Sequence, residues 1–110
     1  MKKSNIFAYA ELEKLVGNLL HAKSNLKEHI VAQAAYFHII DSRYFSDELA
    51  PIWDEIRTKL GYSSTQALKG QQFLKNNMLE AMKKVSEEEC REIIKQINQV
   101  FEGVKNEFNS

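Results

Sequence analysis

The chain has few residues that break helices or form cross-links. It contains one proline, four glycines and one cysteine in 110 residues. So few turn-forming residues leave little room for the many chain reversals of a β-sandwich, and they favour a few long helices. The single cysteine, Cys90, excludes a disulfide within one chain and a metal cage built from its cysteine thiolates.

Net charge and long apolar runs are scarce as well. Fifteen basic and fifteen acidic side chains cancel, so no global field favours wholesale binding of nucleic acid or of an anionic membrane. No segment approaches the roughly 18 apolar residues of a membrane span. The apolar run at 6–10 is too short for the core of a signal peptide. We therefore expect a cytoplasmic protein that does not enter a membrane.

What the sequence does contain is an ordinary globular composition. Apolar residues make up 44% of the chain and charged residues 27%, which differs from the composition of a disordered tail. The length suits one domain with one modest core, and no linker or internal repeat divides it. We predict a single helical domain over residues 1–110.

Apolar residues at helical spacing predict two helical segments in the first half, at about 5–22 and 26–44. Whether residues 5–44 form one long helix or two is open on the pattern alone. A tight turn at 23–25 is favoured, because Asn25 and Glu28 have the spacing of a capping box. The second segment is apolar nearly all round, which is typical of a central helix.

Three further helices are predicted in the second half. One begins at Ser46 or Asp47 and stops at Gly61, the next runs from about 63 to 85, and the last opens with the capping box of Ser86 and Glu89. The predicted fold class is all-α: an antiparallel helical bundle of four main helices plus one short helix, the short one being the third.

Residues that could carry chemistry do not converge in the sequence. His38 and Asp41 share a helix face, but two ligands hold a metal poorly and no Glu-x-x-His pair is present. Paired carboxylates fall on predicted polar faces or first helical turns, and Cys90 has no histidine in its half of the chain to act as a base. We expect no metal, no cofactor and no enzymatic activity.

One segment, at 53–75, is similar to the middle of a helix-turn-helix, because a glycine ends one helix and a Ser/Thr run begins the next. Arg57 and Gly70 depart from the motif, since each stands where an apolar residue is usual. The basic stretch 57–84 is either a binding surface or a solvated face. On the DNA-binding hypothesis, the residues that contact the major groove or phosphate are Thr65, Gln66, Lys69, Gln72 and Lys75.

The function we expect is a non-catalytic protein–protein interaction or regulatory module, such as a small adaptor, inhibitor or immunity-type protein. Its partner is another protein, a second copy of the chain in a homodimer, or both. A DNA-binding transcriptional regulator that uses 53–75 is the alternative. Aromatic residues near predicted helix ends are the candidate interface anchors wherever they are exposed: Tyr44, Phe45, Trp53 and Tyr62.

Overall fold

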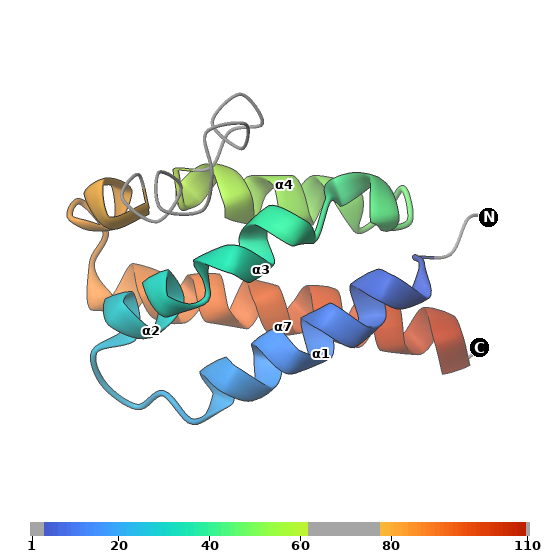
Figure 1. Cartoon of the computed structure of the whole chain (residues 1–110), viewed down its shortest axis with the longest axis horizontal. Helices are drawn as coiled ribbons and strands as arrows, with labels where there is room; N and C mark the ends of the chain where they lie inside the picture. Colours follow the sequence, from blue (N-terminus) through green and yellow to red (C-terminus); the bar gives the residue numbers. More distant parts are fainter. Residues whose placement is uncertain (1–3, 62–77, 110) are drawn as a thin grey trace.

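The computed structural model describes residues 4–61 and 78–109, and in these residues it contains helices and no strand. Residues 78–82 are helical. The named elements, shown in Figure 1, are α1 (Ile6–Leu20), α2 (Leu26–Ala32), α3 (Ala34–Ile39), the 3₁₀ helix η1 (Ser42–Tyr44), α4 (Ala50–Lys59) and α7 (Glu87–Asn109). The all-α class is confirmed for the described part of the chain.

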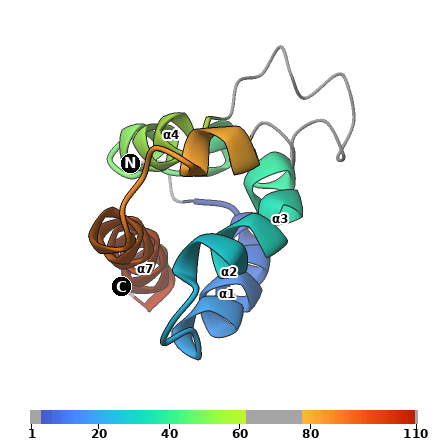
Figure 2. The ribbon, with the colours of Figure 1, turned by 90° about the vertical axis from the view of Figure 1, so that its left-hand side faces the viewer.

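Helix α7 is the element against which the others pack. It contacts α1, α4 and α2, and Figures 1 and 2 show that α1 and α4 both run in the direction opposite to α7. Its buried residues recur every three or four positions, so they form one apolar stripe along 23 residues. The stripe consists of Cys90, Ile93, Ile97, Val100 and Val104.

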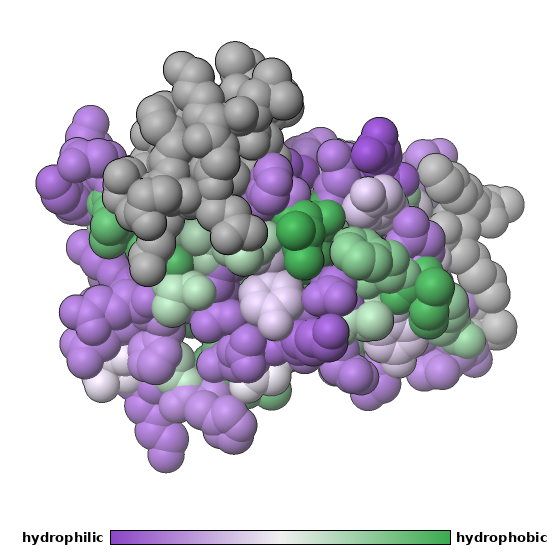
Figure 3. Space-filling view, viewed as in Figure 1, coloured by the Kyte–Doolittle hydropathy of each residue, from purple (hydrophilic) through white to green (hydrophobic). Residues whose placement is uncertain are grey.

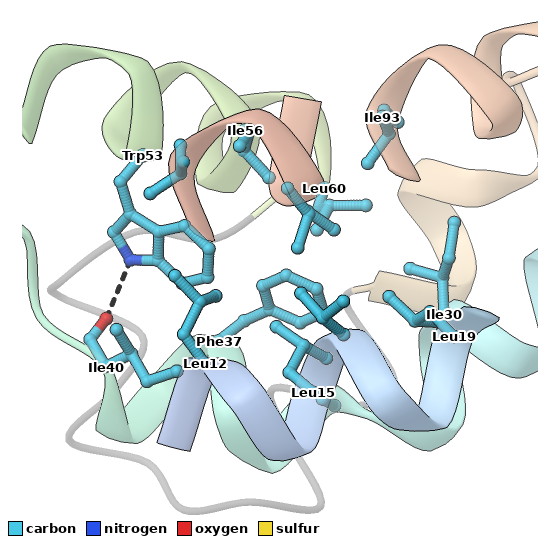
Figure 4. Close-up of a cluster of buried hydrophobic side chains, with 14 of the residues drawn as sticks. Leu12, Leu15, Leu19, Ile30, Phe37, Ile40, Trp53, Ile56, Leu60 and Ile93 are labelled. Atoms are coloured by element: carbon cyan, nitrogen blue, oxygen red, sulfur yellow. Dashed lines mark hydrogen bonds between the residues drawn. The ribbon is translucent and has the colours of Figure 1, made fainter. Parts of the chain in front are cut away.

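The core lies between α7 and the remaining helices (Figure 4). At its centre Trp53 of α4 is fully buried and stacks on Phe37 of α3, with ring centroids 5.7 Å apart. Its indole N–H donates a hydrogen bond of 2.8 Å to the backbone carbonyl of Ile40, so the one polar atom of the ring is paired in the core. Trp53 therefore fixes α4 against the end of α3.

The predicted turn between the first two segments is confirmed. Helix α1 ends at Leu20, and α2 begins after Asn25, whose φ of 53° lies in the left-handed region. Asparagine tolerates this conformation better than most residues. The Asn25 side chain makes no capping hydrogen bond, so backbone geometry rather than a capping box separates the two helices.

The prediction of one helix over 26–44 is wrong. The segment is divided at Gln33, where the backbone has φ −97° and ψ 16°, and α3 stops at Ile40, which is extended. Its apolar residues therefore belong to two short helices and the 3₁₀ helix η1. The expected set of long helices of matched length is accordingly wrong for this part of the chain.

The predicted caps of the third helix are wrong, whereas its predicted end is confirmed. Helix α4 begins at Ala50 with Leu49 as its N-cap residue, and no side-chain capping hydrogen bond is made there. The Ser46 carbonyl accepts the N–H groups of Leu49 and Ala50 in the turn that precedes the helix. At the other end Gly61 has a φ of 78°, which a glycine adopts without strain.

The predicted fourth helix, at 63–85, falls largely outside the described residues. In its described part Met78 and Met82 are buried, whereas Leu79 is 46% exposed. The antiparallel arrangement of four main helices stays a prediction.

Hydrogen bonds join the first described residues to η1 and to the last turns of α7. The Ser4 N–H donates to Oε1 of Glu107 at 2.9 Å, and the Asn5 N–H donates to the Tyr44 carbonyl at 2.8 Å. The Asn5 side chain also accepts the Ala8 N–H and caps α1. Residues far apart in the sequence thus meet at the start of α1.

Candidate functional site

Exposed apolar side chains gather on one face of the molecule. Figure 3 shows apolar surface over the end of α3 and the start of α1. The large apolar residues that these elements leave in solvent are Ile6, Phe7 and Ile39, which are 67%, 44% and 37% exposed. The Phe7 ring meets the half-buried Tyr44 ring edge to face, with centroids 5.7 Å apart. We call these four residues the α1–α3 surface.

Helix geometry explains why these side chains cannot enter the core. Ile6 precedes the buried Ala8 by two residues, and Ile39 follows the buried Phe37 by two. A step of two residues turns an α-helix by about 200°, so each isoleucine points away from the core-facing side of its helix. Their exposure follows from helix register. An apolar cluster left on the surface in this way is typical of a binding site.

The border of the α1–α3 surface is polar. The guanidinium of Arg43 lies 5.5 Å from the centre of the Tyr44 ring and 3.9 Å from the Asp41 carboxylate. A side-chain hydrogen bond to Tyr44, and then the charge of Asp41, raise the pKa of Arg43, so this cation is charged at every accessible pH. An apolar centre beside an aromatic ring and a charged edge is the usual composition of a protein interface.

The predicted anchors separate into exposed and buried residues. Tyr44 belongs to the α1–α3 surface. Phe45 and Trp53 do not meet the condition of exposure, because they pack together in the core with ring centroids 5.5 Å apart. The pattern assigned them to helix ends, but Phe45 is buried before α4 and Trp53 lies on the buried side of α4. Tyr62 lies outside the described residues.

Sequence analysis missed Ile6, Phe7 and Ile39. The signal that could have identified them is the helical position opposite the buried stripe, together with the size of the side chains. In the apolar runs at 6–10 and 30–40, adjacent large residues cannot all face one core, so some must face solvent.

No family model, curated protein or solved structure matches the chain. Among the helices that the structure describes, none has both the length and the apolar character required to cross a membrane. The functional argument therefore depends on surfaces of the described residues.

The side chains that could bind a metal or act as a nucleophile do not form one site in the described part of the chain. Within residues 4–61 and 78–109, no three histidine, cysteine, aspartate or glutamate side chains come together as a metal-binding group. The Cys90 thiol is fully buried, and burial, followed by the charge of Glu87, raises its pKa. A raised pKa opposes formation of the nucleophilic thiolate.

The DNA-binding hypothesis falls mostly on residues that the structure does not describe. All five candidate contacts lie there: Thr65, Gln66, Lys69, Gln72 and Lys75. Arg57, at the start of the basic stretch, is buried on α4 with 6% exposure, so it does not add its charge to an open basic face. The hypothesis stays a prediction.

Proposed function

We propose that the protein is a non-catalytic protein–protein interaction or regulatory module, of the adaptor, inhibitor or immunity type, and that the α1–α3 surface is its interface. The observation that carries this proposal is the exposure of Ile6, Phe7 and Ile39 beside the ring of Tyr44. Burial of a large apolar side chain contributes about 1.5–3 kcal/mol, so a partner that covers these residues gains substantial binding free energy.

The packing and capping of α1 favour tight binding at the α1–α3 surface. Ile6 and Phe7 stand on α1, whose opposite side carries Ala8, Leu12 and Leu15 into the core. The first turn of α1 is capped by Asn5. Side chains presented by a packed and capped helix lose little conformational entropy on binding, which increases affinity.

Two sequence-based expectations accompany this proposal. We propose that the helices pack as an antiparallel bundle, and that the protein acts in the cytoplasm. The directions of α1, α4 and α7 support the first of these. The partner is a different protein or a second copy of the chain.

The test is a double substitution on the interface with a matched control. Ile6→Ala with Phe7→Ala removes two exposed side chains, and Leu20→Ala removes one at the other end of α1 that is 64% exposed. Sedimentation measures self-association, and capture from the lysate of the native host, with nuclease present, measures binding of other proteins. We expect the double variant to lose association while its helical content and unfolding midpoint match those of the control.

The proposal is wrong if the double variant keeps every association of the unaltered protein. Retained material that disappears with nuclease and with rising salt would instead favour the DNA-binding alternative, because phosphate contacts weaken steeply as salt is added.

A further inference from the structure

A shallow hollow of about 390 Å³ is lined by residues of the turn that follows α1, the start of α2 and the first half of α7. These segments lie at the end of the molecule away from the start of α1 (Figures 1 and 2). We call this cavity the α2–α7 hollow. Its walls are of two kinds, apolar and basic, and none of its lining residues in the described part of the chain is acidic. The lining residues are Ala22, Lys23, Leu26, Arg91, Ile94 and Lys95.

Local sequence places these groups on one face. Ser86 caps the start of α7 at Glu87. Within this helix Arg91, Ile94 and Lys95 are spaced i, i+3 and i+4, so they share one side. The left-handed Asn25 reverses the chain and brings Leu26 against α7, where it is buried. Leu26 and the half-buried Ile94 therefore form an apolar floor between basic side chains.

The basic side chains of the hollow are available to an acidic partner. Arg91 and Lys95 pair with glutamates one turn earlier, at 3.3 and 3.5 Å, and all four of these side chains are more than half exposed. Such exposed pairs contribute little, about 0–1 kcal/mol each, so a partner's carboxylate can compete with Glu88 and Glu92 for these two cations. Within the described residues, Lys23 takes part in no ion pair.

We propose that the α2–α7 hollow binds a short, acidic, amphipathic helix of a partner protein. One apolar side chain of that helix packs on Leu26 and Ile94, and its flanking carboxylates pair with Lys23, Arg91 and Lys95. The charge of the rim selects an acidic occupant and accelerates its association. A helix fits better than a small anionic molecule, because small-molecule sites enclose most of their ligand whereas these cations lie in solvent.

The inference does not require the α1–α3 surface, because the hollow and that surface share no residue. It deepens the interaction-module proposal by adding a second contact of defined chemistry. Substitutions at Ile6 and Phe7 leave the hollow intact, so the two proposals can fail separately.

The test uses the whole protein and a synthetic 14-residue peptide with leucines at positions 1, 4, 5, 8, 11 and 12 and glutamates elsewhere. Two comparison peptides carry lysine in place of glutamate or alanine in place of leucine. Amide NMR shifts locate the binding, and fluorescence anisotropy gives the affinity. We expect shifts confined to residues 22–26 and 91–95 for the Glu/Leu peptide, an affinity that falls with salt, and weaker binding of both comparison peptides.

Charge reversal supplies the decisive variant. Lys23→Glu with Lys95→Glu should weaken binding at least about tenfold, because both reversed charges repel the peptide. Lys14→Glu with Lys105→Glu makes the same change of net charge at exposed positions outside the hollow. If reversal prevents folding, Lys23→Gln with Lys95→Gln removes the charges without repulsion and should still weaken binding.

Several results would overturn the inference. The proposed site would be wrong if the peptide shifted amide NMR signals elsewhere in the molecule, or shifted none. If both double variants weakened peptide binding equally, the net charge of the protein, and not the hollow, would explain the loss. Binding of decanoate in the hollow without binding of the peptide would assign a small amphiphile as the occupant.

Discussion

Residues 26–44 and helix α7 bury similar numbers of apolar residues, six and five, but they differ in backbone structure. Helix α7 is continuous for 23 residues, whereas 26–44 is divided into α2, α3 and η1. The difference lies in the positions of the buried residues rather than in their number. On an ideal helix, with 100° per residue, the five buried residues of α7 span an arc of about 80°. The six buried residues at 26–40 would span about 180°.

A straight helix that packs on one side only cannot bury half of its circumference. Dividing the segment at Gln33 lets the buried residues of α2 and of α3 face the same interior on two separate axes. The second division, at Ile40, frees the carbonyl that accepts the Trp53 indole N–H. A narrow apolar stripe is therefore compatible with a continuous helix, whereas a wide one requires either a central position or a division.

The largest expected effect on stability comes from removing the Trp53 side chain, which holds the end of α3 against α4. Trp53→Ala should lower the free energy of unfolding by about 3–5 kcal/mol, because a fully buried indole is lost and a cavity is left. Urea unfolding followed by circular dichroism measures the change. Trp53→Phe is the matched control, since it keeps a ring but leaves the Ile40 carbonyl without its donor, at a cost of about 1–3 kcal/mol. A loss below that of the control would show that Trp53 does not hold α3 and α4 together.

The next effect concerns the turn that starts the divided segment. Asn25→Ala should cost about 1–2 kcal/mol, because alanine disfavours the left-handed conformation that Asn25 adopts. Asn25→Gly should be nearly neutral, since glycine adopts this conformation freely and the Asn25 side chain makes no cap. Thermal unfolding of the two variants in parallel measures the difference. Equal stability of the variants would mean that the backbone at 25 is not what separates α1 from α2.

A smaller effect is expected at the start of α7, where a side chain performs the capping. The Ser86 Oγ accepts the Glu89 N–H at 3.1 Å. Ser86→Ala should cost about 1 kcal/mol and Ser86→Gly a few tenths, as at other helix N-caps. Urea unfolding of both variants measures these costs. A Ser86→Gly variant as unstable as Ser86→Ala would contradict the assignment.

The smallest effect emerges only at alkaline pH. Burial raises the pKa of the Cys90 thiol above the value of about 8.5 that it has in the unfolded chain. The folded state then holds a proton that the unfolded state has lost, so the free energy of unfolding falls as pH rises above about 8.5. Urea unfolding between pH 7 and 10, compared with Cys90→Ala, isolates this contribution. Parallel pH profiles would show that the thiol does not contribute.

Periodicity predicted the features that depend on local sequence. The helical class of the described residues, the turn at 23–25, the glycine stop at Gly61 and the Ser86 cap of α7 are confirmed. These features are encoded within a few residues of each other. The divisions at Gln33 and Ile40 were missed because they depend on which residues must reach a shared core.

The candidate site was predicted only in part, for a related reason. Of the aromatic anchors, Tyr44 lies on the α1–α3 surface, while Phe45 and Trp53 are buried. Position near a helix end does not determine exposure, because the chain on either side of η1 folds back onto the core. The basic and apolar lining of the α2–α7 hollow joins residues 22–26 to 91–95, and no local pattern relates segments so far apart.

The pairing of α1 with α7 bears on how the chain is made. Ribosomes extend a chain by about 5–20 residues per second, from the N-terminal side. Helix α1 is therefore synthesised well before α7, so the apolar side chains that it packs against α7 are not fully covered until α7 has emerged. The nascent chain exposes its apolar face for several seconds, which makes it a substrate for chaperones that bind apolar segments.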